Sequence, residues 1–239
     1  MCGQNTITKI YFNRVSLMKN RITIVFILVS FIEIFAINFN SVTFQYIAKP
    51  LLVPALILLL WLSKTPVPGK NILLAGLFFS WAGDIFLLLL NSNALFFIFG
   101  LACFLITHLF YITFFLKIRS NKISLIKKYP FLLLLVIGYG ITLVWLLYPH
   151  LADLKIPVII YATVICTMLL CSLHVYYKVN KPSGIFYLTG AVAFVLSDSL
   201  LAFDKFYQPF SFAGELIMIT YCAAQYFIVR GFAAQKLDT

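Results

Sequence analysis

The chain has 239 residues, of which 63% are apolar and only 10% are charged, and its mean hydropathy is +1.02. A soluble domain carries about 25% charged residues, so this composition excludes a soluble enzyme and a disordered chain. At about 20 residues per spanning helix, the length leaves room for one all-α integral membrane domain and no separate aqueous domain.

Eight apolar runs are long enough to cross a bilayer. They cover residues 22–38, 46–62, 72–90, 95–116, 130–148, 156–176, 185–203 and 211–229. We therefore predict an eight-helix transmembrane bundle over 22–230, with a basic cytoplasmic segment (1–21) before it and a short cytoplasmic tail (231–239) after it. The basic segment leads straight into the first apolar run, which is typical of an uncleaved signal anchor.

The basic residues are divided unequally between the two sides of this predicted bundle. Of the 18 Lys and Arg residues, only Lys49, Lys155 and Lys205 fall on the side opposite the N-terminus. The positive-inside rule then places both termini in the cytoplasm, and we expect a multi-pass protein of a bacterial inner membrane. Because topology accounts for the net charge of +11, we expect no nucleic-acid partner.

The two halves of the chain match each other when one is shifted by 114 residues without gaps. The matched pairs are Lys64 with Lys178, Pro68 with Pro182, Gly76 with Gly190, Asp84 with Asp198, Leu87 with Leu201, Phe96 with Phe210 and Gly100 with Gly214. These matches favour a parallel four-plus-four internal repeat. Chance matching in a restricted alphabet is the alternative.

Asp84 and Asp198 lie inside predicted spans, where a mid-helix aspartate costs about 2.5 to 3.5 kcal/mol to insert. At 1.5 Å per residue they stand about 18 and 20 Å from the cytoplasmic starts of their helices, so we expect them to face one central cavity. The alternative is a structural clamp, in which each aspartate only holds neighbouring helices together through hydrogen bonds.

Two neighbouring carboxyl groups in a low dielectric do not both ionise easily, so one keeps its proton near neutral pH while the other is an anion. Such a pair can serve as a general acid and a general base. It suits a reaction with an oxocarbenium-like transition state, in which an acid delivers a proton and a carboxylate faces the developing cation.

Other polar residues at spanning depth are candidates for binding a substrate, and each also has a structural interpretation. Lys49 can snorkel to the outer interface, hold a phosphate, or act as counter-ion to an aspartate. His108 and Tyr111 share one helix face, where the histidine is either a packing residue or a proton donor. The remaining candidates, which can bind a headgroup or bridge helices, are Tyr161, Tyr221 and Gln225. The five cysteines lack paired spacing, and we expect neither a metal nor a cofactor.

Six motifs in order resemble the lysoplasmalogenase, or YhhN-like, family of multi-pass membrane proteins. They are KPLLVP (49–54), FSWAGD (79–84), FLITHLFY (104–111), PVIIYATVICTM (157–168), SDSLLAFDKF (197–206) and YCAAQYFI (221–228). The resemblance implies hydrolysis of the vinyl ether bond of a lysoplasmalogen to a fatty aldehyde and a glycerophospho-base. It also implies that Asp84 and Asp198 are the catalytic pair and that the partners are a lysophospholipid and membrane lipid.

Two other classes of protein also place charged groups inside the membrane. Gly83-Asp84 matches part of an intramembrane aspartyl protease motif, but Trp81 and Ala82 break the pattern and no Tyr-Asp partner precedes Asp198. A lipid or small-solute transporter is the stronger alternative, and Gly/Pro breaks in corresponding helices would favour it. The oligomeric state cannot be read from this sequence.

Overall fold

The computed structural model describes residues 2–236 except 64, 66, 91, 92, 94 and 119, with side chains described from Leu17 onward. This part of the chain consists of helices joined by turns and short loops and contains no strand. Its α-helices are α1 (Cys2–Asn38), α2 (Val42–Trp61), α3 (Lys70–Leu88), α4 (Leu95–Lys117), the single-turn α5 (Leu125–Lys128), α6 (Phe131–Leu147), α7 (Lys155–Val175), α8 (Lys181–Ala202) and α9 (Ala213–Ala234).

Within the described residues, eight helices are long and apolar enough to cross a membrane. The predicted eight-helix bundle is therefore confirmed, and the chain is a multi-pass membrane protein. The observed spans differ from the predicted ones mainly in where two of them begin or end. The first span begins at Leu17 within a helix that already starts at Cys2, and the seventh continues through a π-helical turn to Tyr207.

The C-terminal end of the bundle extends beyond the predicted domain limit at residue 230. Helix α9 continues to Ala234, and Phe232 and Gln235 are buried. Gly231 packs so closely on the ring of Tyr187 that an added Cβ would lie 2.5 Å from it, and the Tyr187 hydroxyl donates to Gln235 Oε1 at 2.7 Å. These residues belong to the folded bundle because they complete its packing against α8.

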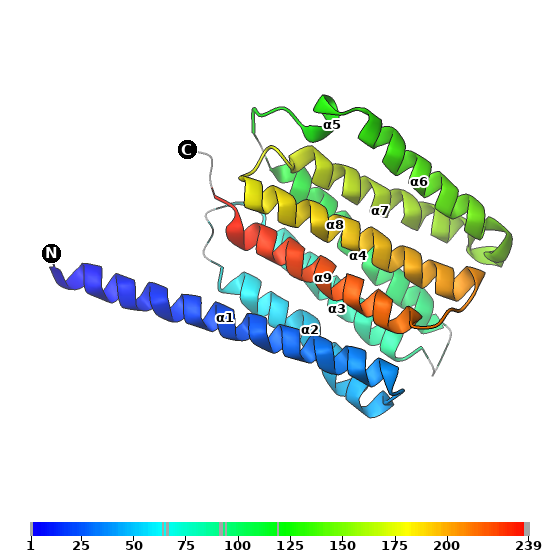
Figure 1. Ribbon diagram of the computed structural model, residues 1–239, viewed down its shortest axis with the longest axis horizontal. Helices are drawn as coiled ribbons and strands as arrows, with labels where there is room; N and C mark the ends of the chain where they lie inside the picture. Colours follow the sequence, from blue (N-terminus) through cyan, green and yellow to red (C-terminus); the bar gives the residue numbers. More distant parts are fainter. Residues whose placement is uncertain are drawn as a thin grey trace.

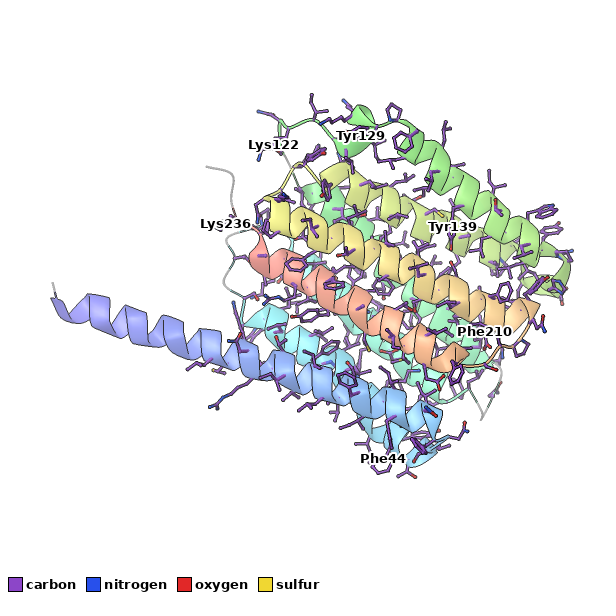
Figure 2. All side chains as sticks on the ribbon, in the orientation of Figure 1. Phe44, Lys122, Tyr129, Tyr139, Phe210 and Lys236 are labelled. Atoms are coloured by element: carbon purple, nitrogen blue, oxygen red, sulfur yellow. The ribbon has the colours of Figure 1, made fainter. Side chains whose placement is uncertain are left out.

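Helix α1 begins and helix α9 ends at the same end of the bundle (Figure 1). Lys122 and Lys236 lie at this end in Figure 2, whereas Phe44 and Phe210 lie at the opposite end. The even number of spans in the described chain produces this arrangement, and it gathers most of the basic connections at one end.

Most of the helix packing has the same pattern in both halves, although α1 also packs against α9 and the equivalent pair in the described chain, α6 and α4, has no comparable contact. Helix α3 packs along α4 as α8 packs along α9, and α1 packs on α2 as α6 packs on α7. Across the halves, α2 contacts α9 and α7 contacts α4. In Figure 1, α1 with α2 and α6 with α7 form opposite sides of the bundle, with the other four long helices between them. A parallel four-plus-four repeat requires this correspondence.

Two glycines at equivalent positions of the repeat permit close approach of the central helices. A Cβ on Gly76 would lie 2.7 Å from the ring of Tyr111 on α4, and a Cβ on Gly190 would lie 3.0 Å from the carbonyl oxygen of Ala224 on α9. Because neither site has room for a side chain, the two glycines fix how deeply α4 and α9 sit against α3 and α8.

Helix α2 remains one helix although it contains Pro50 and Pro54. Proline has no N–H, so Pro54 leaves the carbonyl oxygen of Pro50 without its usual helical partner. The indole of Trp81 on α3 replaces that partner, since its Nε1 donates to the Pro50 oxygen at 2.9 Å. This bond fixes α2 against α3 next to Lys49, the residue before Pro50.

The first prediction concerns topology. A reporter that is active only in the cytoplasm, fused after Thr239, should be active, because the positive-inside rule places the common end of α1 and α9 there. A reporter that is active only outside should be silent in the same fusion. The opposite pattern would contradict the orientation while leaving the eight-helix bundle unchanged.

Candidate active site

Asp84 is buried on α3, with 2% of its surface exposed. The hydroxyl of Tyr221, on α9, donates to Asp84 Oδ2 at 2.6 Å. A buried carboxyl group at this depth needs such a donor, because an unpaired one costs several kcal/mol. The tyrosine therefore holds α9 against α3 and orients the carboxyl group.

The hydrogen bonds continue from Tyr221 along the inside of the bundle. Its hydroxyl lies 2.8 Å from Ser80 Oγ, which also accepts from Gln225 Nε2 at 2.5 Å. Gln225 Oε1 in turn accepts from the hydroxyl of Tyr111 on α4 at 2.7 Å. Tyr111 and Gln225 occupy equivalent positions under the 114-residue shift, so this bond joins the two halves of the repeat.

Asp198 lies on α8 in a second network that involves α4 and α7. The Tyr161 hydroxyl donates to Asp198 Oδ2 at 2.5 Å, and His108 Nε2 lies 3.0 Å from the same oxygen. His108 is fully buried, and no hydrogen-bond partner among the described residues reaches its Nδ1. With its proton on Nε2, the histidine is a second donor to Asp198.

Asp198 lines two of the cavities that the described structure contains. One has a volume of about 40 Å³ between α4, α7 and α8, and another of about 30 Å³ lies towards α6. A groove of about 270 Å³ between α4 and α7 shares four lining residues with the first cavity: Phe97, Leu101, Val158 and Tyr161. The carboxyl group therefore stands beside apolar hollows of the kind that hold hydrocarbon.

The two aspartates are held in separate networks, and no hydrogen bond between described residues connects these. The ring of Phe104 lines the cavity of Asp198 and packs edge-on against Tyr221 with centroids 5.8 Å apart. The ring of Phe194 contacts His108 and Tyr221, at 5.1 and 5.9 Å. Two aromatic rings thus stand where the sequence predicts a single cavity, and a common cavity for both carboxyl groups stays a prediction.

Lys49 is half-buried on α2, and its charge acts on both Asp84 and Glu33. Of its three sequence-based interpretations, this placement favours the counter-ion. The other predicted residues fall into the two networks: Tyr111, Tyr221 and Gln225 lie with Asp84, whereas His108 and Tyr161 lie with Asp198.

The sequence analysis did not identify Ser80 or Ser199. Ser80 precedes Asp84 by one helical turn and therefore shares its face, which is a signal that the FSWAGD motif carries. Ser199 follows Asp198 directly and accepts from Tyr139 of α6 at 2.7 Å. In the described chain, no group of three or more His, Cys, Asp and Glu residues is placed to hold a metal ion.

Comparisons with known proteins found a family model and a curated relative that match this chain. The model of the YhhN family matches residues 44–232. A curated relative, lysoplasmalogenase TMEM86A of Bos taurus, is 31% identical over 169 residues, which are 67% of this chain and 65% of that protein. The chain thus aligns with about 65% of the length of this relative. No solved structure matches the chain.

The second prediction tests the bond between the two halves. Tyr111→Phe leaves Gln225 Oε1 buried without its donor, which should lower the free energy of unfolding by about 1–3 kcal/mol. Thermal unfolding in detergent measures the change. Tyr46→Phe is the control, because the Tyr46 hydroxyl is exposed and its bond to the Leu88 oxygen is long, at 3.5 Å. Equal destabilisation by both variants would contradict the assigned role of Tyr111.

Proposed function

This chain belongs to the YhhN family, and from that premise we propose that it hydrolyses the vinyl ether bond of a lysoplasmalogen, releasing a fatty aldehyde and a glycerophospho-base. The name of the curated relative, a lysoplasmalogenase, supports this substrate class. The observation that carries the proposal is the placement of Asp198. It combines a carboxyl group, two hydrogen-bond donors and apolar cavities at membrane depth.

The alkenyl chain of the substrate lies in the apolar groove between α4 and α7. This groove is lined mainly by aliphatic and aromatic side chains and borders the Asp198 cavity through Phe97, Leu101, Val158 and Tyr161. A lysolipid has a single hydrocarbon chain, and burying each CH₂ group contributes about 0.8 kcal/mol. Sliding of the chain along the groove brings the vinyl ether, next to the headgroup, to Asp198.

Asp198 carries the first proton transfer. Tyr161 and His108 both bond to Oδ2, so Oδ1 is the oxygen that faces the reactant. Its proton moves to the β-carbon of the C=C bond, whose π electrons form the new C–H bond. The α-carbon and the ether oxygen then share the positive charge of an oxocarbenium ion, and Asp198 is left as an anion beside it.

Water completes the reaction. A water molecule attacks the α-carbon and gives a proton back to Asp198, which forms a hemiacetal and restores the acid. The hemiacetal hydroxyl then loses its proton, the bond to the glycerol oxygen breaks, and that oxygen gains a proton. The products are an aldehyde and an alcohol, and the only co-reactant consumed is one water molecule.

Asp84 is the second carboxyl group of the mechanism and acts at a distance. It lies behind Phe104, in contact with Tyr221 rather than with the cavity. In a medium of low dielectric, an anion stabilises a nearby developing cation even without contact. The negative charge of Asp84 therefore stabilises the oxocarbenium ion, while Asp198 donates the first proton and takes one back from water.

Transport of a lipid or solute is the alternative function. Transporters of this kind carry unwound breaks in corresponding helices. In the described chain, α2 stays continuous through Pro50 and Pro54, and α6 stays continuous through Gly138 and Gly140. The continuous helices favour the hydrolase.

The third prediction separates a catalytic aspartate from a structural clamp. Asp198→Asn keeps the size of the side chain but cannot donate a proton, so aldehyde release should fall by roughly a hundredfold or more, the scale of general acid catalysis. Asp84→Asn should also lose activity, because it removes the stabilising anion. If the aspartates were only clamps, the neutral amides would be easier to bury, and both variants would fold and turn over at wild-type rates.

The fourth prediction concerns the donors to Asp198. Tyr161→Phe removes one of two bonds to Oδ2 and should lower kcat by about tenfold, since bonds to a charged group contribute about 1.5–3 kcal/mol. Tyr139→Phe is the matched control, because Tyr139 bonds to the neighbouring Ser199 and not to the carboxyl group. An equal loss in both variants would mean that the effect is a general one on packing.

A further inference from the structure

Glu33 is an acidic residue with only 1% of its surface exposed. It lies on α1, in the second half of the first span. No described side chain donates a hydrogen bond to either of its carboxyl oxygens, and the backbone N–H of Lys49 is the donor that acts on it. The mechanism proposed above does not use it, and it precedes residues 44–232, which the family model covers.

Groups on three other helices lie within electrostatic range of Glu33. Helix α1 packs against α2 and α9. The charges of Lys49 on α2 and of Asp84 on α3 act on Glu33, and Cys222 on α9 lies within the field of all three groups. The cluster thus holds two carboxyl groups and one ammonium group in the same part of the bundle.

Charge balance limits how many protons this cluster holds. An uncompensated charge buried at membrane depth is costly. With Lys49 as a cation, the cluster is neutral when one carboxyl group is ionised and the other is protonated. The lack of a side-chain donor to Glu33 disfavours its anion, whereas Asp84 has the donor Tyr221.

We propose that Glu33 and Asp84 share one proton beside Lys49, which makes Glu33 a positioning residue for the charge of Asp84. The proton resides mainly on Glu33, so Asp84 carries the negative charge. The consequence for turnover rests on the proposed function, because it assumes that the anion of Asp84 stabilises the transition state. The sharing of the proton itself does not depend on any activity.

Infrared spectroscopy of the purified protein tests the sharing directly, because a protonated carboxyl group has a carbonyl band that a carboxylate lacks. Glu33→Gln leaves Asp84 as the anionic partner of Lys49, and Asp84→Asn leaves Glu33 in that role. Each single variant should therefore lose one protonated-carboxyl band relative to the wild-type protein. Lys49→Met removes the cation and should add one such band. Glu215→Gln, a half-buried change at the start of α9, is the control and should leave this band unchanged.

Retention of the band in Asp84→Asn would overturn the proposal, since Glu33 would then hold its own proton independently of Asp84. Retention in Glu33→Gln would overturn it as well, because the proton would belong to Asp84 alone. Both variants replace a carboxyl group by an amide of the same size, and the band of Lys49→Met gives a separate test if either fails to fold. An unchanged band in Lys49→Met would also contradict the shared proton.

Activity gives a second readout. In Glu33→Gln the pH–rate profile should lose the limb that belongs to the shared proton, with KM unchanged. If the variants lose their infrared bands but Glu33→Gln keeps the wild-type pH–rate profile, the shared proton is supported. The assumed role of the Asp84 charge in turnover is then contradicted. A changed pH–rate profile, in contrast, requires both the shared proton and a role of the Asp84 charge in turnover.

Discussion

Burial of carboxyl groups inside a membrane is the constraint on which this structure depends. Water is absent at that depth, so each carboxyl group must find donors or a cation within the protein, or keep its proton. Asp84 is held by Tyr221 and lies in the field of Lys49, and Asp198 is held by Tyr161 and His108. Each of these partners comes from a different helix than its aspartate. The polar contacts therefore determine how α3 and α8 sit against α9, α4 and α7.

The two halves of the chain share a scaffold but differ in chemistry. Under the 114-residue shift, Gly76 and Gly190 allow the same close packing in both halves, whereas His108 on α4 corresponds to Cys222 on α9, and Ser80 corresponds to Phe194. Ser80 extends a closed polar network around Asp84, and Phe194 packs against His108 beside Asp198. The larger cavity beside Asp198 lies where α4, the helix of the first half that carries His108, meets α7 and α8 of the second half. Under the proposed function, Asp198 transfers the protons and Asp84 acts through its charge.

The sequence predicts the spans, their even number and the polar residues that the structure gathers into two networks, because hydropathy and unpaired polar groups are properties of single segments. It pairs the two aspartates by depth but does not reveal Phe104 and Phe194 between the networks, since rotation of each helix about its axis is set by packing with its neighbours. The same limit applies to Glu33. Its position in an apolar run indicates depth, but only the contacts of α1 with α2 and α9 bury it without a side-chain donor.

The most direct measurement of the central claim compares two substrates that differ only in the reacting bond. The purified protein is incubated with a lysoplasmalogen and with its ester-linked analogue, and the free aldehyde and the free fatty acid are quantified. Our account predicts aldehyde from the vinyl ether and no fatty acid from the ester, because protonation of a C=C bond starts the reaction and the ester lacks that bond. Release of fatty acid from the ester, or absence of aldehyde from the vinyl ether, would contradict it.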